Sequence, residues 1–251
     1  MKKAWLLPVA SAALLSVSAA GQFLIRERRV VSSPALAESA FAALGAFRSV
    51  VSEVIWFRAD RLREEGRYVE LAQLASLLVH MEPHTPEVWS YSAWNMAYNI
   101  SIMMSSPADR WRWVYAALKL LRDNGLKYNP REAELYREIA WMFEVKIGAD
   151  IDSASSVYRE KWAGIVRDVA SRGAWNELGM DAMEMLEIER RTGFSDWTNP
   201  QLSAIYWAAK GLRFAKGGDR AFLNSIIRQA KILYGKTGGV KQSAANAGKE
   251  G

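Results

Sequence analysis

Residues 56–89 read WFRADRLREEGRYVELAQLASLLVHMEPHTPEVW, and this stretch decides the fold. Its apolar residues recur at intervals of three and four positions, which is the spacing of an amphipathic helix. Gly66 interrupts the pattern and Pro83 ends it, so the spacing predicts two helices joined by a tight turn. A third helix is expected to begin after Pro83 and to carry Trp89 and Trp94.

The opening of that third helix returns 47 residues later in the chain. A fixed offset at which large residues match large ones and small residues match small ones is typical of stacked helical hairpins. The chain is therefore predicted to be all-α and built from such hairpins. The matched pairs are Pro83 and Pro130, Glu87 and Glu134, Trp89 and Tyr136, Ala93 and Ala140, Trp94 and Trp141, and Ile100 and Ile147.

The composition agrees with a folded, aromatic-rich protein. The chain has 251 residues, and half of them are hydrophobic, which excludes a disordered protein. Eleven tryptophans supply large side chains for a helical core. There is no cysteine, which excludes disulfides, a thiolate nucleophile and cysteine-ligated metal sites. The net charge of +6 is compatible with an anionic neighbour but does not require one.

The N-terminus has the pattern of a targeting or anchoring segment. Lys2 and Lys3 precede the uncharged residues 4–25, which are long enough to cross a bilayer as one helix. The small residues 18–20 would suit cleavage of a signal peptide, but arginines follow at residues 26, 28 and 29 and hinder translocation. We expect residues 1–29 to be an uncleaved anchor in a bacterial inner membrane. The flanking charges nearly balance, and we prefer a periplasmic folded domain.

The rest of the chain divides into a linker, a repeat domain and a tail. Residues 30–37 are expected to form the linker, 38–234 the helical repeats, and 235–251, which are poor in large apolar side chains, a disordered tail. The first helix is predicted over 38–65. The later units are expected to pair residues 86–104 with 107–124 and residues 131–147 with 151–170, followed by capping helices over 175–191, 200–216 and 219–234.

One unit resembles the tetratricopeptide repeat. Tyr68 follows the turn glycine, Gly66, by two residues, Pro83 follows that glycine by seventeen, and Trp89 and Ala93 open the next unit. The resemblance implies a right-handed solenoid of antiparallel helix pairs. It covers residues 51–148, and the layout of anchor and hairpins also resembles a group of bacterial membrane-anchored proteins. The chain departs from the family pattern within the second helix of the unit, at Leu71, Ala75 and Leu78.

In the tetratricopeptide family, the first helix of each unit lines a concave face that grips extended peptides. Two asparagines four residues apart form a polar strip on one such helix, since asparagine is a poor residue inside a helix unless it has a polar partner. The alternative is an ordinary solvated helix face. The predicted protein-binding residues are Arg58, Arg61, Asn95, Tyr98, Asn99 and Arg137, and Lys146 is expected on the same face.

Other patterns argue for less specific roles. His80 and His84 have the spacing of a metal pair, but a proline lies between them and no further histidine exists, so we expect surface residues and no metal site. Trp111 and Trp113 alternate with arginines, yet point to different faces of a helix, so we do not expect nucleic-acid binding. The segment 210–236 is rich in lysine and arginine, which is compatible either with a capping helix or with a helix that contacts lipid.

No catalytic motif is evident, and we do not expect an enzyme, a cofactor or a small-molecule substrate. The leading hypothesis is a membrane-anchored scaffold that binds a peptide or helix of another protein in its concave groove. The alternative is a structural subunit at the membrane surface, whose basic C-terminal helix contacts anionic lipid.

Overall fold

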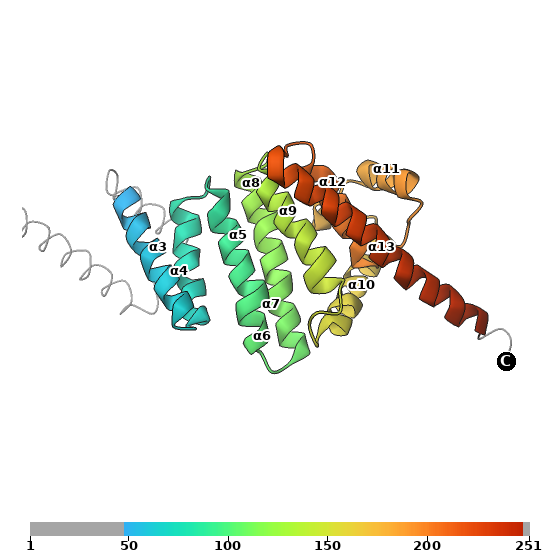
Figure 1. The fold of residues 1–251 in the computed structure, drawn as a ribbon, viewed down its shortest axis with the longest axis horizontal. Coiled ribbons are helices and arrows are strands. Elements are labelled where there is room, and N and C mark those ends of the chain that lie inside the picture. The colour runs from blue at the N-terminus through green and yellow to red at the C-terminus, as the bar shows by residue number, and fades with distance from the viewer. Residues whose placement is uncertain (1–47, 248–251) are drawn as a thin grey trace, which may run out of the picture. The chain divides into compact units, whose positions relative to one another are not determined.

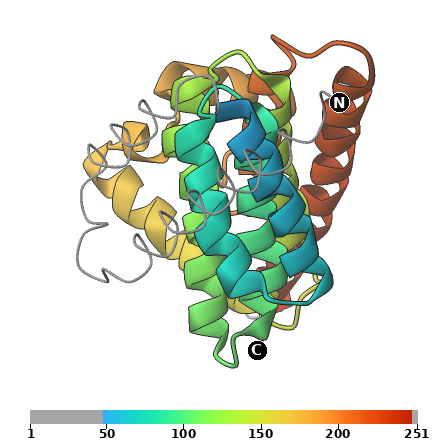
Figure 2. The same ribbon diagram turned by 90° about the vertical axis from the view of Figure 1, so that its left-hand side faces the viewer.

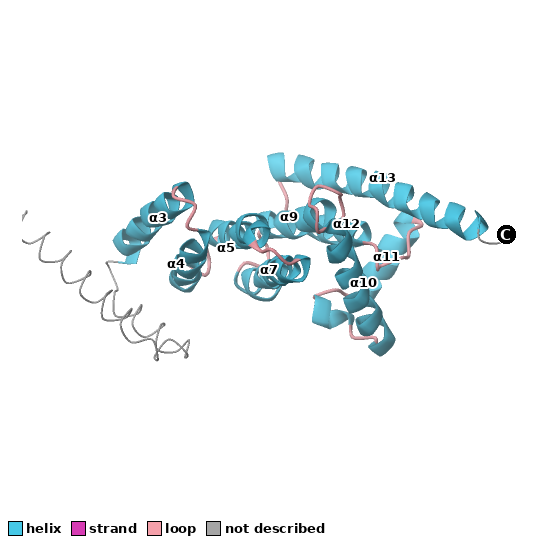
Figure 3. Ribbon diagram, turned by 90° about the horizontal axis from the view of Figure 1, so that it is seen from below, coloured by secondary structure: helices cyan, strands magenta, loops and turns pink. Residues whose placement is uncertain are grey.

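The structure, a computed structural model, describes residues 48–247, and the side chains of residues 51–236 within them. The described residues from Ser52 onward belong to one compact unit. The expected anchor, the linker and the start of the first helix lie outside the described residues. Every regular element of residues 48–247 is a helix, which confirms the all-α class (Figure 3).

The first helix pair follows the sequence prediction closely. Helix α3 (Arg48–Glu64) and helix α4 (Tyr68–Met81) are joined at Gly66, whose φ of 70° is in the left-handed region that favours glycine. Helix α4 ends two residues before Pro83, as the prediction requires. Buried side chains at the turn end of the pair form a small core of their own, consisting of Ala59, Leu62 and Leu71.

The second pair consists of two long helical rods, each containing one wider π-helical turn. The first rod runs through α5 (Pro86–Trp94), η2 (Asn95–Ile100) and α6 (Ser101–Met103). The second runs through α7 (Pro107–Lys119), η3 (Leu120–Gly125) and α8 (Leu126–Tyr128). Prolines open both rods at the first helical turn, where the missing N–H leaves no bond unmade.

The first helix of the third pair repeats the second in detail. It consists of α9 (Ala133–Trp141) and η4 (Met142–Ile147). The π-helical turns η2 and η4 begin directly after the matched Trp94 and Trp141 and end at the matched Ile100 and Ile147. The sequence offset is therefore an offset between equivalent backbone shapes.

The matched aromatic residues Trp89 and Tyr136 occupy equivalent positions. The Trp89 indole N–H donates to the carbonyl oxygen of Pro83 at 2.9 Å, and the Tyr136 hydroxyl donates to that of Pro130 at 2.9 Å. Both rings are buried. A tryptophan and a tyrosine can make the same bond because each has an apolar body and a single polar group at its end.

Each of these aromatic residues approaches a glycine on the second helix of its pair, through the atoms at the base of its side chain. Trp89 lies against Gly125 and is stacked on Tyr128 at a centroid distance of 5.9 Å. Tyr136 lies against Gly211 and is stacked on Phe214 at 5.7 Å. In both pairs the glycine allows the close approach, and the aromatic residue three positions later covers the ring.

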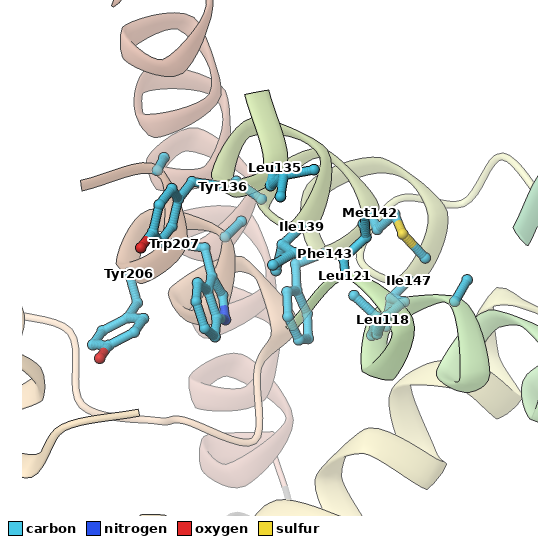
Figure 4. Packing of buried hydrophobic residues seen from close by; sticks show 14 of the residues in the cluster. Leu118, Leu121, Leu135, Tyr136, Ile139, Met142, Phe143, Ile147, Tyr206 and Trp207 are labelled. Atoms are coloured by element: carbon cyan, nitrogen blue, oxygen red, sulfur yellow. The ribbon is translucent and has the colours of Figure 1, made fainter. Parts of the chain in front are cut away.

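This equivalence corrects the predicted partner of the third pair. Helix α9 packs mainly against α12 (Pro200–Gly211), not against residues 151–170. The intervening residues form an insert of three elements: α10 (Ser155–Arg172), η5 (Trp175–Leu178) and α11 (Ala182–Thr192). Figure 4 shows α9 and η4 side chains facing Trp207 of α12. Residues 200–208 of α12 are all buried, as expected of a helix enclosed by its neighbours.

The last helix, α13 (Gly217–Ala247), packs against α9 and α12. Leu223, Ile226 and Ala230 supply its buried side. The helix continues past residue 235, where the composition predicts the start of a tail. Helix α13 crosses in front of α10 in Figure 1, and Figures 2 and 3 show the two helices on opposite sides of the paired helices.

Substitution of Gly211 by alanine tests the close approach of Tyr136 to this glycine. An added Cβ would lie 2.7 Å from the Cβ of Tyr136 and 3.1 Å from Leu223, so we expect a loss of about 1–3 kcal/mol in the free energy of unfolding. Gly164→Ala is the matched control, because an added Cβ at that helical position would contact nothing. This variant should gain roughly 0.5–1 kcal/mol in the free energy of unfolding. Urea denaturation measures the unfolding free energy of both variants, and equal changes in the two would contradict the packing described.

Candidate functional site

Four aromatic side chains on the elements α5, η2, α9 and α13 define the candidate site, which we call the aromatic row. It consists of Trp94, Tyr98, Trp141 and Phe222. Trp94 and Tyr98 are four residues apart, and their rings are stacked with centroids 5.7 Å apart. The ring centroids of Trp141 and Phe222 are 5.4 Å apart. Trp94 remains 44% exposed and Phe222 39% exposed, although aromatic side chains this large are more often covered.

Charged groups connect the elements that carry this row. Arg137 of α9 pairs with the neighbouring Glu138 at 3.0 Å and with Asp219 of α13, and its guanidinium lies 5.8 Å from the Phe222 ring centroid. Burial raises the pKa of Glu138 despite its pairing with Arg137. Burial, together with the charge of Glu138, raises the pKa of the Tyr98 hydroxyl. The predicted residues Tyr98 and Arg137 therefore share one electrostatic environment, but Arg137 is already paired within the chain.

The predicted residues Arg58 and Arg61 lie elsewhere on the surface. Both are exposed on α3, and Arg61 pairs with Glu65 at 3.1 Å near the turn into α4. No contact described in residues 51–236 joins either arginine to the aromatic row. Both arginines are accessible to a partner because they are exposed, and the surface pair of Arg61 contributes little to stability.

Asn95 corrects the expectation of an open polar strip. It is only 1% exposed, and its side-chain amide donates to the Tyr68 carbonyl oxygen at 3.3 Å. Asn99, which is half-buried, donates in turn to the Asn95 side-chain oxygen at 3.0 Å. Asn95 therefore ties η2 to α4. A π-helical turn holds one residue more than an α-helical turn, which moves the following side chains to a different face than regular spacing predicts.

Lys146 was also expected on this face, but it lies inside a buried ion-pair network. Its ammonium group is 2.6 Å from an oxygen of Asp152, which also accepts a hydrogen bond from Tyr158 at 3.1 Å. Arg110 of α7 reaches the other oxygen of Asp152 at 3.4 Å. Burial acts to raise the pKa of Asp152, but hydrogen bonds from Lys146, the Ala154 N–H and Tyr158 hold it below its ordinary value. The network joins the start of the insert to η4 and α7.

Asp152→Asn should be far more costly than the loss of a surface charge. It would leave Lys146 buried without its carboxylate, for which we expect a loss of about 3–5 kcal/mol in unfolding free energy. Asp168→Asn, at an exposed pair with Arg172, is the control and should cost at most about 1 kcal/mol. Comparable losses in urea denaturation would show that the network contributes no more than a surface pair.

Glu144 of η4 is a second buried charge that the sequence analysis did not single out. Its side chain is buried, one carboxyl oxygen has no hydrogen-bond partner among the described residues, and burial raises its pKa to about 7. Gln201 of α12 hydrogen-bonds the backbone oxygen of Glu144 at 3.0 Å. The sequence feature that could have indicated this site is the single acidic residue within the largely apolar sequence of η4, MFEVKI.

Glu144 makes the stability of the fold fall as pH rises. Between its ordinary pKa of 4.5 and about 7, the folded chain holds a proton that the unfolded chain releases, so unfolding becomes easier across this window. Glu144→Gln should remove this dependence and stabilise the protein at pH 8 by on the order of 2 kcal/mol, with little effect at pH 5. Thermal unfolding of the variant and of the unaltered protein at pH 5 and pH 8 checks this. The same change in Tm at the two pH values would contradict it.

The histidines considered for metal binding and the tryptophan considered for nucleic-acid binding make ordinary contacts within the fold. His80 and His84 are exposed and contact backbone oxygens of Ser76 and Tyr128. Trp111 is buried and stacked on Tyr115 at 5.3 Å. Within the part of the chain that the structure describes, no three His, Asp or Glu side chains are grouped to hold a metal ion.

None of the helices between residues 48 and 247 combines the length and apolar character needed to span a membrane. Comparison of the chain with protein-family models, with curated proteins and with solved structures finds no match. Function is therefore inferred from the chain's own residues and their arrangement.

Proposed function

We propose that this chain is a scaffold that binds a segment of another protein through the aromatic row. The observation that supports this is the different surroundings of Trp94 and Trp141, which occupy equivalent repeat positions. Trp141 is partly buried and contacts Phe222 of the chain's own last helix, whereas Trp94 is 44% exposed and stacks on Tyr98 of its own helical rod. Exposed aromatic residues held on rigid helices are typical anchors for a protein partner.

The repeat architecture expected from the sequence supports the same proposal. In our interpretation, α3, α5–η2, α9–η4 and α13 are the successive first helices of a right-handed, tetratricopeptide-like solenoid, and α4, α7–η3 and α12 are the second helices. The ring contact of Trp56 with Tyr91, and the packing of α5 on α9 and of α9 on α13, agree with this order. First helices in such a solenoid present one continuous face.

The partner segment is expected to offer an apolar or aromatic side chain to Trp94. Asn99 lies one turn further along the same rod, and its side-chain oxygen has no partner among the described residues. It could accept a hydrogen bond from the backbone of a peptide. Arg58 and Arg61 could contact a partner that extends toward α3. Asn95 and Arg137 would support the site without touching the partner, because both are engaged within the chain.

We further propose that residues 1–29 anchor this scaffold in a bacterial inner membrane, with the helical domain preferably on the periplasmic side. This part of the proposal rests on the lysines before residues 4–25 and on the length of that uncharged run.

The alternative, a lipid-contacting last helix, receives less support from the packing. Its apolar stripe is the part that would enter a membrane surface. Ile226 and Ala230 of that stripe are buried and belong to the main core. The polar side of α13, with Arg228 and Lys231 exposed, suits the outer end of a helical stack. We therefore propose a single function.

A photo-crosslinking amino acid placed at Trp94 in the full chain, in its native host, tests the proposal. We expect a discrete protein adduct from position 94 and none from position 112, because Arg112 is an exposed residue of α7 outside the aromatic row. Replacing Tyr98 by alanine should reduce the yield of that adduct several-fold, since truncating an anchor typically costs more than about 1 kcal/mol of binding. No adduct at position 94, or the same adducts at both positions, would refute the aromatic row as a binding site.

A further inference from the structure

A groove lies between the insert and the last helix, and none of its lining residues belongs to the aromatic row. It is a groove of about 650 Å³ with α11 and α13 at its sides and α12 beneath it. Met183, Ala209 and Ile227 contribute its accessible apolar surface, and the buried side chains of Ile188 and Ile205 lie beneath it. Two helices flanking a third form the type of groove that accepts another helix.

The outer side of α11 extends this apolar surface. Met183, which lines the groove, is 74% exposed, and Leu186, three residues further on, is 57% exposed. Met185 and Ile188 already supply the buried contacts of the same short helix. Helix α11 therefore presents apolar side chains to the core and also to solvent, which a helix with no further partner does not need.

Charge at the groove is unevenly compensated. Glu184 is fully engaged, because it accepts hydrogen bonds from Tyr206 at 2.8 Å and Arg213 at 2.6 Å and pairs with Lys210 at 3.1 Å. The other lining acid, Glu187, pairs with Arg190 at 2.7 Å. The remaining lining cations, Arg191 on α11 and Lys231 on α13, have no acidic partner among the described side chains. They flank the groove from its two walls.

We propose that this groove binds an acidic amphipathic helix of a partner protein. Its apolar face would cover Met183, Ala209 and Ile227, and its carboxylates would meet Arg191 and Lys231. The chain's own N-terminal 47 residues do not match this chemistry, because they carry Lys2, Lys3 and three arginines against two glutamates. This site is independent of the aromatic row, so either can fail without the other.

Two designed helical peptides of equal length and identical leucine spacing provide the probes. One has glutamates on its polar face and the other lysines, and fluorescence anisotropy measures their binding to the full-length protein in detergent. We expect the acidic peptide to bind with a Kd in the range of about 10–100 μM, weakening as salt is raised, and the basic peptide not to bind.

Charge reversal distinguishes the groove from non-specific attraction. Arg191→Glu with Lys231→Glu should weaken the acidic peptide at least about tenfold and allow the basic peptide to bind. The matched control is Lys161→Glu with Arg167→Glu, which makes the same charge change at exposed positions of α10 and should leave both affinities unchanged. Met183→Ser with Leu186→Ser should weaken the acidic peptide without changing the charge, and circular dichroism checks that each variant is folded.

Three results would overturn the proposal: no binding of the acidic peptide, equal binding of both peptides, or equal loss of acidic-peptide binding in the groove and control variants. Competition from a synthetic peptide of residues 30–47 that displaces the acidic probe would also overturn it, in favour of the chain's own segment as the occupant.

Discussion

The close approach of an aromatic residue to a glycine is the constraint on which the described helical domain depends. In the second and third pairs, an aromatic residue is fixed by a hydrogen bond to a proline carbonyl, and the base of its side chain lies close to a glycine of the opposite helix. Burial of one such side chain contributes roughly 2–3 kcal/mol. The hydrogen bond also sets where the ring sits, so each pair meets in the same register and its first helix presents the same face.

That register explains why so little of the candidate face is free. The chain covers Trp141 with α13 and uses Asn95 and Arg137 for its own contacts between helices. What remains open is concentrated at Trp94 and around Asn99. The insert offers a separate surface, since α11 has apolar side chains on two sides. An interaction protein built in this way would have two faces of different chemistry, one aromatic and one apolar with a cationic border.

Local patterns were readable from the sequence, and long-range partners were not. The turn at Gly66, the helix ends near Pro83 and the equivalence of Trp89 with Tyr136 depend on neighbouring residues or on a fixed offset. The pairing of α9 with α12 was missed because Gly211 and Phe214 repeat Gly125 and Tyr128 only after the insert, which changes the spacing. The shift of side chains in the π-helical turns has no simple sequence signal. The burial of Glu144 and Lys146 depends on partners far along the chain.

The position of the insert has a consequence for how the chain acquires its structure. The first two pairs join segments that are close in sequence, so they can close soon after synthesis. The third pair joins α9 to α12 across more than fifty intervening residues, which raises the entropic cost of bringing the two helices together. During translation, α9 is also synthesised well before α12, with which it pairs. Until α12 leaves the ribosome, Tyr136 and the apolar side of α9 lack their cover. This intermediate is where a chaperone would be most useful and where aggregation would begin.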